Sequence, residues 1–335
     1  MSLDAGLRAL MEPVAGEASF AELLANPSGM NRLEAFGGAG LPYSPPRVHV
    51  MEAQALGPNG LVPLRVYGPL GEDGPLRVDG PLRGKADDGG GPGLVWLHGG
   101  GFAGGDLEMR EADQLARELV ARTGGVVISV DYRLARGGVH FPVPHEDVIA
   151  AWFWAVEQAS GLGIDPGRLC LGGASAGANL ACGAAMYLKD IGSPLPAKML
   201  LAYPFLHSTV PPVTVPSAVM SSLPPFLRFS AEDCTAMLEN YLGGPASSAS
   251  SYAVPGHGDP TGLPPAAVVA CEYDDLRPSA EMYAQSLRGA GVEVAFRLEE
   301  GATHGYLNHS AALDIVQRGL AFLASELASA DGSND

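Results

Sequence analysis

The sequence has few cysteines and no histidine cluster, which argues against a metal centre or a disulfide framework. Its four cysteines are scattered at spacings that fit neither: Cys170, Cys182, Cys234 and Cys271. No pair of histidines has metal-ligand spacing with a third ligand nearby. We therefore expect no metal, and we expect buried, reduced thiols.

Basic residues are also scarce. The chain has 20 Lys and Arg against 37 Asp and Glu, and the net charge of -17 would repel phosphate backbones and anionic lipid head groups. No apolar run approaches the ~20 residues of a membrane-spanning helix. The first residues, MSLDAGLRALMEPVAG, lack the uninterrupted apolar core of a secretion signal. These features predict a cytoplasmic protein with neither a nucleic acid nor a membrane as partner.

What the sequence does have is an alternation of strand-like and helix-like segments from about Val48 onward. Segments rich in Val, Leu and Ile and bounded by Gly or Pro are typical of strands: 61–67, 94–98, 126–130, 169–171, 199–203, 266–271 and 292–298. Helical spacing of apolar residues marks 108–122, 146–160, 178–188, 279–288 and 311–327. The alternation predicts an α/β fold, with a mostly parallel sheet covered by helices on both faces.

Two regions interrupt this alternation and divide the chain. Residues 46–204 and 263–335 are predicted to form the α/β core. Residues 1–45 and the Pro- and Ser-rich segment 205–262, with one expected helix at 231–241, are predicted to form a helical cap. Within the core, the Gly-, Pro- and Asp-rich stretch 68–93 is predicted to be a flexible loop.

A sharp turn is expected where the sequence reads Gly173-Ala174-Ser175-Ala176-Gly177, between a short apolar strand and a helix of small residues. At a strand-turn-helix junction the central residue has a strained backbone, and small neighbours let its hydroxyl project at the edge of the sheet. Ser175 is therefore a candidate nucleophile. The pentapeptide alone is weak support, because a chain with 45 glycines produces such patterns by chance.

A second glycine-rich turn, His98-Gly99-Gly100-Gly101-Phe102, follows the strand at 94–98. Its N–H groups could stabilise the oxyanion of an ester hydrolase. Alternatively, Gly99-x-Gly101-x-x-Gly104 matches the dinucleotide-binding fingerprint, with Asp131 as the ribose-binding acid. A dinucleotide loop should open its helix directly, but here the helical pattern is delayed. The oxyanion interpretation is favoured, because a tetrahedral oxyanion needs preorganised N–H donors.

A serine nucleophile needs a histidine to take its proton and a carboxylate to orient that histidine. On such a scaffold the chain order is Ser, then Asp or Glu, then His, each after a strand. The strand at 266–271 is followed by Glu272-Tyr273-Asp274-Asp275. Of the eight histidines, His304 alone lies on a glycine-flanked loop directly after the last strand, while His309 is expected to start a helix. Order and placement together predict a catalytic relay.

Several motifs together resemble the hormone-sensitive lipase family of esterases, the bacterial family IV. The resemblance extends from about Leu61 to the C-terminal helix. It rests on HGGGF at 98–102, DYRLA at 131–135, FPVPHEDV at 141–148, GASAGANLA at 173–181, LPP at 263–265, YDDLR at 273–277 and HGY at 304–306. The chain departs from the family pattern at Ala174, where Asp is usual, at Pro278-Ser279 and at Arg136-Gly137-Gly138.

The resemblance implies an α/β-hydrolase fold with a helical cap. It further implies a triad of Ser175, Asp274 and His304, with oxyanion N–H groups from Gly100, Gly101 and Ala176, and alignment alone favours Asp274 over Asp275. The expected activity is hydrolysis of short to medium acyl esters, which needs no cofactor. The expected partner is a small-molecule ester, and a homodimer through an edge strand is possible.

Two other functions are weighed against this one. A non-catalytic binder on the same scaffold would resemble the plant gibberellin receptors, which lack the relay histidine, whereas this chain keeps His304. An oxidoreductase would use the loop from Gly99 to Gly104 but would leave the turn at Ser175 unexplained.

Overall fold

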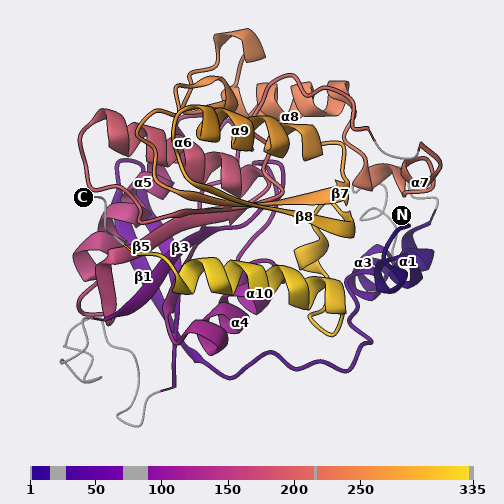
Figure 1. Cartoon of the computed structure of the whole chain (residues 1–335), viewed down its shortest axis with the longest axis horizontal. Coiled ribbons are helices and arrows are strands. Elements are labelled where there is room, and N and C mark those ends of the chain that lie inside the picture. Colours follow the sequence, from indigo (N-terminus) through magenta and orange to yellow (C-terminus); the bar gives the residue numbers. More distant parts are fainter. Residues whose placement is uncertain (1, 16–27, 71–89, 215–216, 332–335) are drawn as a thin grey trace.

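A computed structural model describes residues 2–15, 28–70, 90–214 and 217–331 (Figure 1). Among these residues, eight strands form one sheet in the order β1-β2-β4-β3-β5-β6-β7-β8. The β1–β2 and β2–β4 pairs are antiparallel, and every later pair is parallel. The sheet is therefore mostly parallel, as predicted.

The strands are His49–Gly57 (β1), Gly60–Gly68 (β2), Gly91–Leu97 (β3), Val126–Val130 (β4), Ile164–Ala174 (β5), Met199–Ala202 (β6), Ala266–Tyr273 (β7) and Val294–Thr303 (β8). The α-helices of the described residues are Ala5–Leu10 (α1), Gly29–Phe36 (α3), Asp113–Thr123 (α4), Val143–Gln158 (α5), Ala176–Asp190 (α6), Ser217–Met220 (α7), Ala231–Leu242 (α8), Arg277–Gly289 (α9) and Asp314–Ala328 (α10).

The sequence missed β1, because this edge strand is only partly buried and lacks a continuous apolar run. The Asn59-Gly60 pair at the hairpin turn could have revealed it. α4 starts five residues later than predicted, since residues 107–112 form turns. His309 does not start a helix but follows a 3₁₀ turn, Tyr306–Asn308 (η5).

The predicted flexible loop 68–93 is too long at both ends. Gly68 is the last residue of β2, and 91–93 belong to β3. Residues 71–89, most of that prediction, lie outside the described residues.

Alternate side chains of the strands point to opposite faces of the sheet. In β3, Leu94 and Trp96 pack in a cluster with α4 and α10, whereas Val95 and Leu97 pack in a second cluster with α5, α6 and α9. Figure 1 shows these two helix layers on the two sides of the sheet. Because both faces are covered, the central strands are apolar almost throughout and were easy to recognise in the sequence.

A third apolar cluster joins the N-terminal segment to part of the segment 205–262. Leu7 packs against the core, whereas Leu3, Val14 and Phe36 pack with Met220, Leu223 and Phe226. The rings of Phe36 and Phe226 meet edge to face at 5.6 Å. Two segments far apart in the sequence are therefore held together at one end of the sheet.

Helix α8 is the helix that the sequence predicted in this region. It starts with a capping box in which the Ser230 side chain accepts from the Asp233 N–H and the Asp233 carboxylate accepts from the Ser230 N–H. The structure adds the short helix α7, and Pro225–Leu227 form a 3₁₀ turn.

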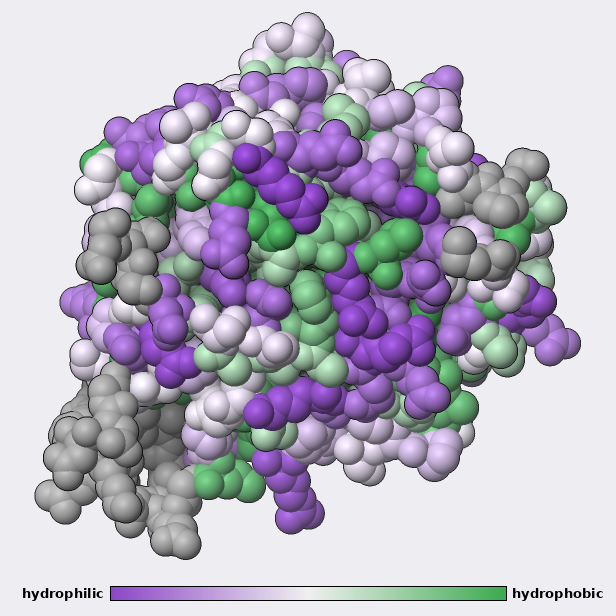
Figure 2. Space-filling model, in the orientation of Figure 1, coloured by the Kyte–Doolittle hydropathy of each residue, from purple (hydrophilic) through white to green (hydrophobic). Residues whose placement is uncertain are grey.

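All four cysteines are buried and unpaired, as predicted. Within the described ranges, no helix is both long and apolar enough to cross a bilayer. Figure 2 shows hydrophilic side chains over much of one face, with smaller hydrophobic areas between them. This is expected when the strands bury their apolar residues between two helix layers.

The close packing of α6 gives a testable prediction. A Cβ added at Gly183 would lie 2.0 Å from the carbonyl oxygen of Tyr252, which is backbone and cannot swing aside. We expect Gly183→Ala to lower the free energy of unfolding by about 1–3 kcal/mol, measured by urea denaturation. Gly289→Ala in α9 is the control, because its Cβ would meet nothing within 4 Å. Equal unfolding midpoints for the two variants would contradict the prediction.

Candidate active site

The turn between β5 and α6 presents Ser175 at the carboxyl edge of the sheet. Ser175 has a φ of 53°, a strained value for a residue with a side chain. Its neighbours make this turn possible, since a Cβ at Gly177 would lie 2.3 Å from the carbonyl oxygen of Leu97. Only a glycine at this position lets α6 start so close to the end of β3. The hydroxyl is held at the surface of the core, with Ser175 8% exposed.

Asp274 and His304 each occupy the first position after a strand, β7 and β8 respectively. His304 Nε2 lies 2.9 Å from Ser175 Oγ, and His304 Nδ1 lies 2.7 Å from Asp274 Oδ2. The other carboxylate oxygen of Asp274 accepts the Leu276 N–H at 2.8 Å. The structure therefore brings these three predicted residues into one hydrogen-bonded chain, because parallel strands end at the same edge of the sheet.

Asp275 points elsewhere and holds the chain of segment 205–262. Its carboxylate accepts Arg228 Nε at 2.7 Å and Nη2 at 3.1 Å, and it also accepts the Phe229 N–H at 2.9 Å. The sequence could not separate the two neighbouring aspartates on its own. In the structure, Asp274 contacts His304 and Asp275 fixes the backbone that covers the site.

The glycine loop after β3 lies against Ser175. A Cβ at Gly99 would be 3.4 Å from the Cβ of Ser175. Gly100 and Gly101 have φ values of 114° and 59°, which favour glycine. Their N–H groups donate to no acceptor among the described residues, so both are free to face a bound group. Ala176, the third predicted donor, is the first residue of α6 and therefore has an N–H with no partner inside the helix.

One side chain from segment 205–262 packs on His304, and another packs on the glycine loop. The ring of Phe229 lies 4.6 Å from the ring of His304, and a Cβ at Gly101 would lie 3.0 Å from Met237 Sδ. Of the other aromatic residues noted in the segment, Phe226 packs on Phe36, and Phe205 is buried near Phe102. His304 is 9% exposed, with the rings of Phe229 and Tyr203 packed on its own.

Three residues near the site were missed by the sequence analysis. Met237 lies on α8, a helix that the sequence predicted without indicating what it would contact. Tyr203 directly follows β6, and its ring lies 5.0 Å from that of His304. Its place after a strand next to β5 was a usable signal. Glu111 is a buried carboxylate that accepts from Gly99 and Tyr203, and no short motif marks it.

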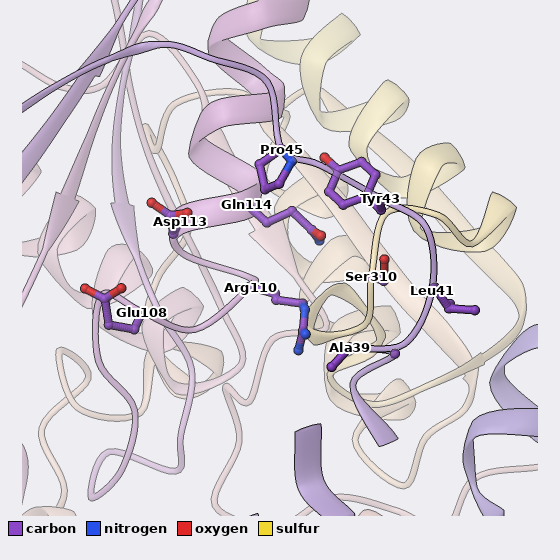
Figure 3. A pocket seen from close by; sticks show the side chains of 10 residues that line it. Ala39, Leu41, Tyr43, Pro45, Glu108, Arg110, Asp113, Gln114 and Ser310 are labelled. Carbon is purple, nitrogen blue, oxygen red and sulfur yellow. The ribbon is translucent and has the colours of Figure 1, made fainter. Parts of the chain in front are cut away.

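A separate pocket of about 190 Å³ is lined by residues on either side of Glu111 but not by Glu111 itself (Figure 3). It is formed between the chain at 38–45, residues 108–114 and Ser310, and it contains none of the predicted site residues. Burial lowers the pKa of Arg110, which points into it. Among the described residues, no group of three or more His, Cys, Asp or Glu side chains is placed to hold a metal ion.

The dinucleotide alternative finds no support in the local structure. α4 begins only at Asp113, so no helix N-terminus follows the third glycine of the fingerprint, Gly104. The residues between them form an irregular loop with turns at 107–108 and 110–112.

The chain is similar to known hydrolases in both sequence and fold. The sequence pattern of the alpha/beta hydrolase fold family matches residues 94–308. The chain is 35% identical to carboxylesterase NlhH of Mycobacterium tuberculosis, over 70% of this chain and 74% of the relative. It is 31% identical to an ethyl acetate hydrolase of Pseudomonas putida, over 79% and 78%. Its fold matches that of a hyperthermophilic esterase from the archaeon Pyrobaculum calidifontis, with a TM-score of 0.80 and 29% identity over 98% of this chain and 99% of that one.

The fold and these matches define an α/β hydrolase. More narrowly, the chain belongs to the hormone-sensitive lipase family of esterases, as its motifs predicted. It is a carboxylic ester hydrolase, which confirms the predicted enzyme class and disfavours the binder and oxidoreductase alternatives.

The role of Asp275 can be tested by hydrogen exchange. Asp275→Asn keeps the shape of the side chain. It loses one of the two acceptor oxygens and the negative charge that binds Arg228. We expect the backbone around Phe229 to open more easily by about 1 kcal/mol, because the pair is partly exposed, and to exchange roughly fivefold faster. Glu281→Gln, which breaks the Arg277–Glu281 ion pair on α9, is the control. Unchanged exchange around Phe229 would refute the assignment.

Proposed function

We propose that the chain hydrolyses short to medium acyl esters through a triad of Ser175, His304 and Asp274. The observation that carries the proposal is the unbroken chain of hydrogen bonds from Asp274 through His304 to Ser175 Oγ. Each member follows a strand of one rigid sheet. Such a chain activates a serine hydroxyl because the histidine can take its proton while the carboxylate fixes the ring.

In the first half of the reaction, Ser175 Oγ attacks the ester carbonyl carbon and its proton passes to His304 Nε2. The negative charge that develops on the carbonyl oxygen faces the N–H groups of Gly100, Gly101 and Ala176. The charge of Asp274 stabilises the imidazolium of His304. This proton then goes to the alcohol oxygen as the C–O bond breaks, which leaves an acyl group on Ser175.

In the second half, water replaces the alcohol. His304 takes a proton from the water, whose oxygen attacks the acyl carbon, and a second tetrahedral oxyanion forms in the same place. Its collapse returns the proton to Ser175 Oγ and releases the carboxylic acid. These steps use the chain's own residues and water, so no cofactor enters the proposal.

We further propose that residues 1–45 and 205–262 act together as a cap that limits the substrate. The third apolar cluster, which joins Phe36 to Phe226, supports this division. Phe229 and Met237 lie close to His304 and Gly101, so a bulky acyl group would have to displace them. This favours short and medium acyl chains, and the similarity to an ethyl acetate hydrolase agrees with it.

Ester hydrolysis by purified variants tests the proposal. With p-nitrophenyl esters from acetate to palmitate, we expect kcat/KM to be highest for the shorter chains. Ser175→Ala should lower kcat by about 10⁶-fold. Asp274→Asn should lower it by about 10⁴-fold, because His304 would no longer be held in the tautomer that accepts the serine proton. Asp275→Asn should cost far less. Ester cleavage that persists in Ser175→Ala, or a maximum at palmitate, would contradict the proposal.

We also propose a homodimer through the edge of β8. This strand is the last of the sheet formed by the described residues, and Val294 to Leu298 are only partly buried. An exposed edge offers unpaired backbone groups to a second copy. Light scattering during size-exclusion chromatography should give about twice the chain mass of 34.5 kDa. A mass of one chain at all concentrations would exclude the dimer.

A further inference from the structure

A buried carboxylate lies behind the glycine loop. Glu111 is 1% exposed and belongs to the turns that precede α4. One of its carboxylate oxygens accepts the N–H of Gly99 at 2.7 Å, and the other accepts the hydroxyl of Tyr203 at 2.6 Å. Both bonds are within the range of charge-assisted hydrogen bonds. Burying such a group is costly unless its hydrogen bonds are made, so its position is closely determined.

The backbone of Glu111 is fixed as well. Its carbonyl oxygen accepts the indole N–H of Trp96 at 2.7 Å, and its N–H donates to Asn308 Oδ1 at 3.3 Å. Trp96 belongs to β3, the strand that leads into the glycine loop. Asn308 lies in the turn that follows His304. Glu111 is thus anchored to both sides of the site.

The bond from Glu111 is the first of a series that orients consecutive peptide groups of the loop. The peptide joining His98 to Gly99 is held on both sides, since its N–H donates to Glu111 and its carbonyl oxygen accepts the Tyr132 hydroxyl at 2.8 Å. The carbonyl oxygen of Gly99 lies 2.7 Å from His98 Nδ1. A carbonyl oxygen can only accept, so this nitrogen carries the proton.

The next peptide is held in the same way. The carbonyl oxygen of Gly100 accepts the N–H groups of Ala103 and Gly104, at 3.2 and 2.8 Å. A trans peptide is planar, with its N–H pointing opposite to its carbonyl. Fixing the carbonyls of Gly99 and Gly100 therefore directs the N–H groups of Gly100 and Gly101 to the other side.

The second bond of Glu111 connects the loop to the wall beside the histidine. Tyr203 has a φ of 37° and is buried, and its ring packs edge to face on that of His304. Burial and the adjacent Glu111 raise the pKa of Tyr203 well above its usual value, so its hydroxyl keeps the proton that it donates. One carboxylate therefore joins the glycine loop to Tyr203, the residue that packs on His304. It thereby holds the loop in a fixed position relative to the histidine.

We propose that Glu111 is a positioning residue for the oxyanion-binding N–H groups. It acts because its side chain is long enough to accept hydrogen bonds from Gly99 and Tyr203 at the same time. The proposal rests on the proposed function, since it assumes that Gly100 and Gly101 face the oxyanion. Glycines have no side chains that could lock such a loop by packing. Without the bond to Gly99, the loop would keep its fold, but the N–H groups of Gly100 and Gly101 would no longer point at the oxyanion.

Two conservative variants distinguish the effect of the length of the Glu111 side chain from the effect of its negative charge. Glu111→Asp keeps the charge but is one methylene shorter, so it cannot reach Gly99 and Tyr203 together. Glu111→Gln keeps the length and an acceptor oxygen for the Gly99 N–H. If reach matters, the Asp variant is the more damaged of the two. If the negative charge matters, the order is reversed.

The measurements are kcat and KM for p-nitrophenyl acetate and the inhibition constant of phenylboronic acid, whose adduct on serine mimics the tetrahedral intermediate. For Glu111→Asp we expect kcat to fall ~10- to 100-fold, KM to change by less than about threefold, and the inhibition constant to rise in parallel with the loss in kcat/KM. Glu111→Gln should stay within about fivefold of the parent enzyme.

A matched control is Glu118→Asp. Glu118 is also a buried carboxylate that accepts a tyrosine hydroxyl, that of Tyr43, but it lies on α4 and touches none of the site residues. Its shortening should lower the unfolding midpoint and leave kcat unchanged. Equal losses of kcat in the two Asp variants would overturn the proposal, and so would an unchanged kcat in folded Glu111→Asp or a Gln variant worse than Asp.

If Glu111→Asp does not fold, Tyr203→Phe gives the same test, because the carboxylate then loses one of its two anchors. We expect kcat and boronic acid affinity to fall together by a few fold at constant KM, and no such shift would overturn the proposal. Ser175→Ala keeps the two hypotheses apart. Activity in Ser175→Ala would refute the proposed function, whereas an inactive Ser175→Ala beside an unaffected Glu111→Asp would refute only the role of Glu111.

Discussion

At the end of β5 the chain must turn into α6 while the end of β3 lies against it. The carbonyl oxygen of Leu97 is so close to Gly177 that no side chain fits between them. Ser175, at the centre of this turn, has a positive φ, and its hydroxyl lies at the sheet edge within 2.9 Å of His304 Nε2. In the proposed reaction the hydroxyl needs no ordering when a substrate binds, because folding has already fixed its position.

The remaining site residues depend on the same sheet. Since β5, β7 and β8 run parallel, the residues that follow them emerge at one edge, and the spacing of the strands sets their distances. The hydrogen bond between His304 and Ser175 therefore joins residues separated by 129 positions along the chain, without a flexible link between them. Burial on both faces of the sheet makes this edge rigid.

Two carboxylates hold the parts of the site that are not on the sheet, namely the backbone at Phe229 and the glycine loop. Asp275 fixes the backbone at Phe229 over His304, and Glu111 fixes the glycine loop at Gly99. Both are carboxylates that accept backbone N–H groups, a contact that orients the chain more sharply than apolar packing does. The site thus has an edge formed by the sheet and two further segments, and in each of these one acidic side chain accepts a backbone N–H group.

The sequence by itself determined the central strands, the helices that cover them, the turn at Ser175 and the loop of His304. These are local: apolar runs, glycines at fixed offsets and order along the chain are visible in short windows. It did not determine β1, whose partly buried residues depend on pairing with β2, or that α4 starts only at Asp113, after turns in which Glu111 is held by distant partners. Only the tertiary structure decided which aspartate contacts His304, where Phe229 and Met237 lie, and how Glu111 reaches Gly99 and Tyr203. Those contacts join segments far apart in the chain, so nothing in a local pattern specifies them, and they form only when the sheet has brought the segments together.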